Sequence, residues 1–408
     1  MGILFRKQDL FFTLILSFSL FLCSSLNAQI NMNTDSTLNA ESPAGRLWGY
    51  AFGDFYYKAH SDLLVRDGVN QFTGIPQKRN AFTLHHIYLG YNYNINKKFS
   101  TELLLAAEDN ATSTSLSGIT TTSGDLLSNN KLSFYIKYAN IRWKNIWKNT
   151  DLVVGQVSTP SFALLTGKIW YYRSIEKTIA DIRKTPSYDL GVTLQGKFDN
   201  KGNSGYNLMV GNGDGAKPEN DNYKWFYGDV YVMFLDKKLV FDLYADYNRL
   251  NWVDGFHHSR NMIKAFAAYI NSNITIGVEA FINNGKNDIV GVNGILKDTT
   301  NATATGISTY IHGNIIKNNL RFFARFDTYN PDTKYDKVAF TKYTGLTSTY
   351  EPNNKEIFIT AGLDFSPCKK IHFLPNIWYV RYKGQQSGSS NTDYDLVYRA
   401  TFYFGFGK

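Results

Sequence analysis

The sequence has almost no cysteine and no long apolar run. Of its 408 residues only Cys23 and Cys368 are cysteines, and Cys23 lies in the N-terminal leader described below. One remaining cysteine excludes an internal disulfide, which argues against a small disulfide-stapled domain. Beyond residue 29 no segment approaches the roughly eighteen consecutive apolar residues of a membrane-spanning helix, so we exclude a helical membrane protein.

The sequence also lacks the short motifs of common enzymes and metal sites. No G-x-S-x-G, H-E-x-x-H, P-loop or C-x-x-C pattern is present, so we expect no enzyme and no cofactor. The pairs His85–His86 and His257–His258 would point to opposite faces of a regular strand, which argues against a metal site. The stretch Asn212–Asn222 lacks the ligand order of an EF-hand, so a plain surface loop is favoured over a calcium site.

The N-terminus has the pattern of an export signal. Arg6 and Lys7 precede the apolar run Leu10–Leu22, and small residues follow up to Ala28. The run is too short to span a bilayer as a helix, so we predict a signal peptide over residues 1–28. The large Leu22 before the first cysteine argues against a lipoprotein.

What the sequence has in excess is aromatic residues and positive charge. It contains 28 Tyr, 29 Phe and 7 Trp, and amphipathic rings of this kind gather where membrane barrels meet the interface. The net charge is +9, or +8 once Arg6, Lys7 and Asp9 of the leader are removed. Such an excess could bias a pore toward anions, or could only reflect lysines scattered over turns.

From Arg46 onward, polar and apolar residues alternate in segments of strand length. We expect a polar lead over residues 29–45 and a single β-domain over residues 46–408. The predicted strands, about sixteen in number, are 46–58, 81–95, 98–109, 132–143, 151–159, 187–199, 205–213, 224–235, 238–250, 259–271, 273–285, 305–316, 319–330, 355–366, 370–383 and 393–406.

The connections between these strands alternate in length. The short ones are 96–97, 236–237, 272, 317–318 and 367–369, and the long ones are 59–80, 110–130, 160–186, 286–304 and 331–354. Outer-membrane barrels have this asymmetry, because tight turns face the periplasm and long polar loops face outward. The sequence therefore predicts an all-β fold, a transmembrane antiparallel β-barrel with short periplasmic turns and long extracellular loops.

The two faces of the strands differ in charge. In 319–330, Phe322 and Phe326 share one face, whereas Arg321 and Arg325 share the other. Arginine or lysine on the lipid face near the bilayer centre costs about 2–4 kcal/mol, so the charged face must line water. The expected lumen residues are Glu102, Lys137, Asp242, Asp246, Lys264, Glu279, Arg321, Arg325, Asp327 and Arg399, with Glu108 and Lys197.

Loop 160–186 is the candidate constriction of this lumen. Within it Ser174–Lys184 predicts a short amphipathic helix, capped at Ser174, with Ile175, Ile179 and Ile182 on one face. Folded inward, the loop would pack these isoleucines on the wall and narrow the channel with charges. Those charges are Arg173, Glu176, Lys177, Asp181, Arg183 and Lys184. The alternative is an external cap or a contact with a neighbouring subunit.

Three stretches add a family resemblance. Val154–Pro160 (VGQVSTP), Tyr172–Lys177 (YRSIEK) and the final strand Tyr398–Phe406 (YRATFYFGF) resemble porin-like outer-membrane proteins of Gram-negative bacteria, including the phosphate-selective porin group. The resemblance implies a passive channel with a constricting third loop, often assembled as a trimer. The final strand departs from the family pattern of a terminal Phe, because Gly407 and Lys408 follow Phe406.

Together these observations lead us to expect a porin in the outer membrane that passes small hydrophilic solutes, with a mild anion preference. Its expected partners are outer-membrane lipid, lipopolysaccharide and solutes, with a homotrimer as the expected assembly and no nucleic acid. The alternative is a non-conducting barrel that acts as a surface adhesin or receptor through loops 110–130 and 286–304.

Overall fold

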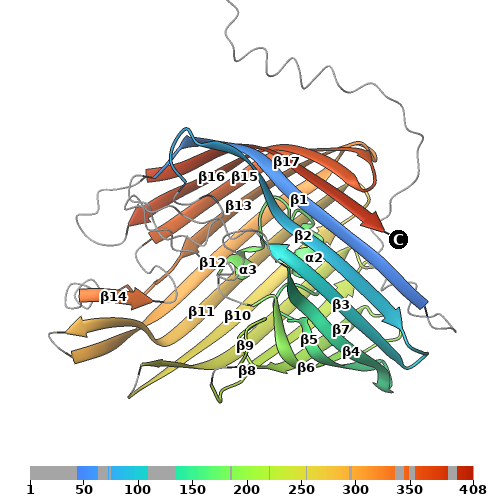
Figure 1. Ribbon diagram of the computed structural model, residues 1–408, viewed down its shortest axis with the longest axis horizontal. Helices are drawn as coiled ribbons and strands as arrows, with labels where there is room; N and C mark the ends of the chain where they lie inside the picture. Colours follow the sequence, from blue (N-terminus) through green and yellow to red (C-terminus); the bar gives the residue numbers. More distant parts are fainter. Residues whose placement is uncertain are drawn as a thin grey trace, which may run out of the picture.

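The strands close into a cylinder (Figure 1). The computed structural model describes residues 44–62, 72, 75–108, 134–183, 186–219, 221–253, 255–293, 296–335, 344–348, 354–384 and 393–407. Sixteen strands form the wall, each antiparallel to its neighbours, and β1 closes the ring on β17. The predicted fold class and all sixteen predicted strands are confirmed, and the expected leader 1–28 and most of the lead 29–45 lie outside the described residues.

The wall strands follow one another around the ring in chain order. They are β1 (Ala44–His60), β2 (Asn80–Asn94), β3 (Phe99–Glu108), β4 (Tyr135–Trp147), β5 (Thr150–Ser158), β6 (Tyr188–Lys197), β7 (Ser204–Gly211), β8 (Trp225–Phe234), β9 (Leu239–Val253), β10 (Phe256–Ile270), β11 (Ile274–Asn293), β12 (Leu296–Ile316), β13 (Leu320–Asn330), β15 (Asn354–Cys368), β16 (Ile371–Gly384) and β17 (Asp393–Gly407). Two short helices, α2 (Thr166–Trp170) and α3 (Ile179–Ile182), lie between β5 and β6.

Tight turns gather at one rim, where β1 begins and β17 ends. Short polar side chains hold several of these turns: the Asn96 side chain accepts from the backbone N–H groups of Lys98 and Phe99, and Asn271 does the same for Asn273 and Ile274. At the turn after β6, backbone N–H groups donate to Asp199 and lower the pKa of its carboxyl. Several turns at this rim are therefore stabilised by hydrogen bonds from backbone N–H groups to nearby Asn and Asp side chains.

One predicted long loop is wrong. Residues 286–304 are not a loop, because β11 and β12 continue through them for 20 and 21 residues and meet in a hairpin. Alternating threonines and apolar residues keep the strand pattern there. A further short strand, β14 (Thr344–Ser348), pairs with this extension of β11, while β13 pairs directly with β15 in the wall.

The outer surface of the cylinder is apolar and the inner surface is polar. On β13, Phe326 is 43% exposed whereas Arg325 is 3% exposed, and on β17 Tyr398 and Arg399 show the same contrast. Exposed rings also lie beside the tight turns, among them Trp147 and Phe234 at the strand ends. This is the outward apolar band with an aromatic girdle that membrane barrels present to lipid. Among the described residues, no helix is long and apolar enough to span a membrane.

Candidate functional site

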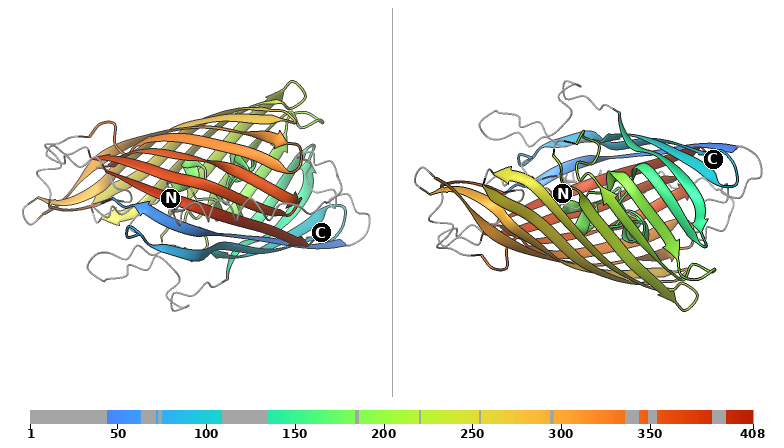
Figure 2. Two further views of the ribbon diagram at one scale, coloured as in Figure 1. Left: turned by 90° about the horizontal axis from the view of Figure 1, so that it is seen from above. Right: turned by 90° about the horizontal axis from the view of Figure 1, so that it is seen from below.

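The connection between β5 and β6 lies inside the cylinder (Figures 1 and 2). We call residues 159–187 the inner loop. At its base the Thr159 hydroxyl and backbone N–H bond to the carbonyls of Pro186 and Ser187, which joins the two ends of the loop. The predicted inward fold of this loop is confirmed.

The apolar side of the inner loop packs on the wall. Ile175, Ile179 and Ile182 are buried, as their spacing predicts. Ile179 lies in a cluster with Phe281 of β11, and Ile175 lies in a second cluster with Phe323 of β13. Burial of such side chains contributes about 1.5–3 kcal/mol each and fixes which wall the loop covers.

The predicted helix over Ser174–Lys184 is shorter in the structure. Only α3 is helical in that stretch, and Thr178 rather than Ser174 caps it by accepting from the Asp181 N–H at 3.3 Å. The reason is that wall arginines take the carbonyls that an earlier helical start would use. Arg399 donates to the carbonyls of Ser174 and Ile175, and Arg325 donates to the carbonyl of Lys177.

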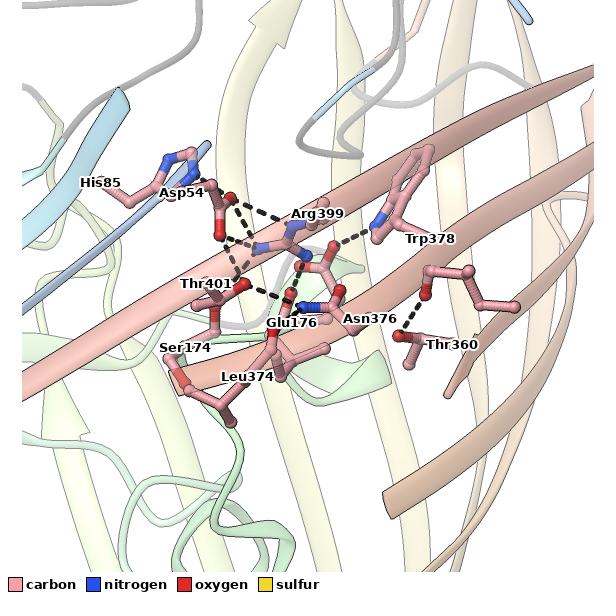
Figure 3. Close-up of polar contacts among 12 residues, drawn as sticks. Asp54, His85, Ser174, Glu176, Thr360, Leu374, Asn376, Trp378, Arg399 and Thr401 are labelled. Carbon is pink, nitrogen blue, oxygen red and sulfur yellow. Dashed lines mark hydrogen bonds and ion pairs between the residues drawn. The ribbon is translucent and has the colours of Figure 1, made fainter. Parts of the chain in front are cut away.

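A buried network anchors the centre of the inner loop to β17 and β1 (Figure 3). The Arg399 guanidinium pairs with both carboxylate oxygens of Asp54 at 2.8–3.0 Å, and His85 and Thr401 bond to the same carboxylate. Both charges are almost fully buried. Because Arg399 also donates to Ser174 and Ile175, one ion pair holds both the wall and the loop.

Besides the Arg325 contact from β13, polar contacts bind the loop to four more strands. Trp378 Nε1 donates to Glu176 at 3.0 Å, and Arg183 donates to Glu356 at 2.5 Å. Other contacts reach Glu279 on β11, His312 on β12 and Asp364 on β15. We call β11, β12, β13, β15, β16 and β17 the covered wall, since the inner loop bonds to each of them.

The structure buries two of the predicted constriction charges. Glu176 and Arg183 face the covered wall and are buried there. Burial disfavours the charge of Arg183, but the neighbouring Glu356 carboxylate outweighs this and raises the pKa of Arg183. Lys177, Asp181 and Arg173 stay partly exposed on the other edge of the loop. Lys184 lies outside the described residues.

Most of the predicted lumen residues point inward but are buried in pairs. Lys264 pairs with Asp242 at 3.1 Å and Arg325 with Asp327 at 2.5 Å. The buried members of the predicted set are Lys137, Asp242, Asp246, Lys264, Glu279, Arg325, Asp327 and Arg399, while Glu102 and Arg321 are partly exposed. Contact with solute stays a prediction for the whole set.

The strands that face the exposed edge of the inner loop carry both buried and partly exposed polar side chains. We call β2, β3, β4 and β5 the open wall. Arg142 of β4 pairs with Asp151 of β5 at 2.9 Å, with both side chains 28% exposed. Near the start of β4, the buried Lys137 pairs with Glu108 of β3.

The inner loop approaches the open wall through cations. The Arg173 guanidinium lies 3.2 Å from His86 Nε2 of β2 and 3.9 Å from Asp181. Burial disfavours its charge, but the neighbouring Tyr88, Asp181 and Glu108 outweigh this and raise the pKa of Arg173. Closer to the base of the loop, the exposed Lys168 interacts electrostatically with Glu102. The inner loop and the open wall therefore face each other across these groups.

The expectation that His85 and His86 point to opposite faces is wrong. Phe52 pairs with His86 and Gly53 pairs with Leu84, so His85 is the extra residue of a β-bulge. Both rings face inward, where His85 Nε2 lies 2.6 Å from Asp54 and His86 meets Arg173. Within the described ranges, no three His, Cys, Asp or Glu side chains are placed to hold a metal ion.

Sequence reasoning missed four contributors to the lumen. Asp54 lies in an aromatic strand with no charge alternation to mark it, and Tyr171 and Lys168 lie in a loop without periodicity. Phe72 of the connection between β1 and β2 is buried beneath Arg399, with 4.9 Å between its ring and the guanidinium. A lone aromatic in a polar loop was the one available signal for Phe72.

Comparisons with known proteins match the chain by structure. Neither a protein-family model nor a curated protein matches its sequence. An anion-selective porin from Comamonas acidovorans is 10% identical, with 90% of this chain and 100% of that chain covered and a TM-score of 0.58. The outer-membrane channel DcaP of Acinetobacter baumannii is 12% identical, with coverage of 90% and 98% and a TM-score of 0.58.

A third match concerns an assembled protein. The outer-membrane protein OmpT of Vibrio cholerae, in a trimer form, is 9% identical, with coverage of 90% and 100% and a TM-score of 0.51. At these identities the likeness establishes architecture. The chain has the 16-stranded barrel fold of the porin-like outer-membrane proteins.

Proposed function

We propose that the chain is an outer-membrane porin through which small hydrophilic solutes diffuse passively. One observation carries the proposal. The inner loop packs its isoleucines on the covered wall and bonds its polar groups to it, whereas the open wall keeps partly exposed polar side chains such as Arg142 and Asp151. A sixteen-stranded barrel is wide enough for an aqueous path unless something fills it, and an inner loop on one side fills only part.

The charges between the inner loop and the open wall favour anions. The exposed edge of the inner loop carries Lys168, Arg173 and Lys177 against one carboxylate, Asp181. Across from it, Lys137 and Glu108 neutralise each other. A ring of excess positive charge in a confined lumen raises the local concentration of anions.

The remaining parts of the proposal rest on sequence and fold. We infer a signal peptide over residues 1–28, a polar lead over residues 29–45, contact with outer-membrane lipid and lipopolysaccharide through the apolar band, and a homotrimer, as the trimer form of OmpT suggests. Membership of the phosphate-selective group rests on the resemblance of Val154–Pro160 and Tyr172–Lys177.

Single-channel recording of the purified chain in planar bilayers tests the function. We expect discrete conductance steps and a reversal potential that reports chloride preference. Reversing two charges with Arg173→Glu and Lys177→Glu should lower the chloride-to-potassium permeability ratio at least about threefold, since one unit charge at about 7 Å in water is worth ~0.6 kcal/mol.

Lys369→Glu is the matched control, because Lys369 is exposed in the turn between β15 and β16. It should leave the ratio unchanged. A barrel that passes no ions at any voltage would sink the porin proposal and favour the adhesin or receptor alternative.

A further inference from the structure

A row of aromatic rings lines the inner face of β1. Trp48, Tyr50 and Phe52 occupy alternate positions, with centroids 6.3 and 6.5 Å apart and ring planes within 17° and 10° of parallel. Alternate residues of a strand share a face, so the row is continuous along the lumen. Tyr50 also contacts Tyr88 of β2 at 4.7 Å and Tyr403 of β17 at 5.6 Å. These rings form a flat apolar surface on the wall.

The inner loop supplies an opposing ring. Tyr171 is 42% exposed although it lies inside the barrel. His372 lies between the two sides, 5.3 Å from Tyr403 and 6.4 Å from Tyr171. The Arg321 guanidinium stacks on Tyr171 at 5.0 Å and orients its ring.

These rings line part of an open pocket of about 140 Å³ between wall and loop. Its lining includes Tyr50, Tyr171, Arg173, Asp364, His372 and Tyr403. An apolar protein cavity of about 150 Å³ admits one benzene molecule, so this cavity has room for a single six-membered ring.

The partly exposed charge at the cavity is positive, although Arg173 also lies 3.9 Å from Asp181. Asp364 is fully buried, and its two oxygens are engaged by His372 at 2.8 Å and by the Tyr172 hydroxyl at 3.1 Å. The Arg173 side chain, by contrast, is 31% exposed and has guanidinium donors beyond the one directed at His86. A sugar hydroxyl could accept from the same guanidinium, but a carboxylate forms the stronger, charge-assisted hydrogen bond with it.

We propose that this cavity is a binding subsite for a small aromatic carboxylate. The ring of the solute stacks between Tyr50 and Tyr171, and its carboxylate accepts hydrogen bonds from Arg173. The inference rests on the proposed porin function for its route of entry, and it adds a substrate class to general anion preference.

Equilibrium binding to the purified full chain in detergent micelles, followed by saturation-transfer NMR, tests the subsite. The probes are benzoate, benzamide with the same ring but no charge, acetate with the same charge but no ring, and glucose. We expect benzoate to bind about tenfold more tightly than each of the others, because stacking and the ion pair each contribute roughly one factor of ten or less.

Two variants separate the two contacts. Tyr171→Ala should weaken benzoate binding about tenfold, and Arg173→Gln should abolish the difference between benzoate and benzamide. Tyr398→Leu, which changes a lipid-facing tyrosine, is the matched control and should bind benzoate normally.

The subsite is overturned if benzamide, acetate or glucose binds as tightly as benzoate, or if Tyr171→Ala changes nothing. Because binding is measured without current, the two proposals fail separately. A barrel that binds benzoate selectively but passes no ions would refute the porin function alone, and a conducting barrel without selective binding would refute the subsite alone.

Discussion

The covered wall and the open wall use the same kinds of residue for different purposes. On the covered wall, Arg399 is buried with Asp54 of the neighbouring β1 in a network that binds the inner loop. On the open wall, Arg142 and Asp151 form a pair of similar length that stays half-exposed. An inward charge therefore does not by itself line a channel, because the position of the inner loop decides which charges meet water and which become structural.

The largest difference between the walls should appear in stability. Arg399→Met leaves the Asp54 carboxylate buried without its cation and frees two loop carbonyls, and we expect a loss of about 3–5 kcal/mol in the free energy of unfolding. Arg142→Met, the matched change on the open wall, should cost at most about 1 kcal/mol. Denaturant unfolding in lipid vesicles measures both, and equal losses would show that the inner loop does not distinguish the walls.

A single hydrogen bond on the covered wall should matter less than the ion pair. Trp378→Phe removes the donor to the buried Glu176 carboxylate and should destabilise the barrel by about 1–3 kcal/mol. Trp143→Phe, on the lipid face of the open wall, removes an indole N–H without leaving a buried acceptor. It should stay within about 0.5 kcal/mol of the parent protein in the same unfolding experiment. A similar loss in both variants would mean that Glu176 finds another donor.

The barrel wall was predictable from sequence because lipid imposes one rule on every strand: apolar side chains point outward and alternate with polar side chains that point inward. Alternation in 319–330 places Phe326 outside and Arg325 inside, and the structure confirms both. The rule failed at His85, where a bulge shifts the register by one residue and brings neighbouring rings to the same face. It also failed at 286–304, where the strands continue beyond the wall. Bulges and extensions depend on pairing with neighbours, which single-strand alternation does not encode.

The inner loop was predictable only in part, for a related reason. The spacing of Ile175, Ile179 and Ile182 predicted a buried face correctly, since any apolar stripe in a polar loop must be covered. The pattern gave no account of where the helix begins, because Arg399 and Arg325 arrive from distant strands to take backbone carbonyls. Burial of a charge such as Arg183 depends on the same distant partners.

The inner loop itself has one edge toward the open wall and one face toward the covered wall. The ion selectivity of the channel should distinguish the charges on these two sides. Arg173 reaches toward the open wall, so Arg173→Gln removes one exposed charge and should lower the chloride-to-potassium permeability ratio about threefold. Arg183 is buried against Glu356, so Arg183→Gln, which keeps hydrogen-bond donors, should leave the ratio of folded channels unchanged. Reversal potentials under a salt gradient measure both. If Arg183→Gln shifted selectivity as much as Arg173→Gln, ions would have to pass along the covered wall, and the division between the two walls would fall.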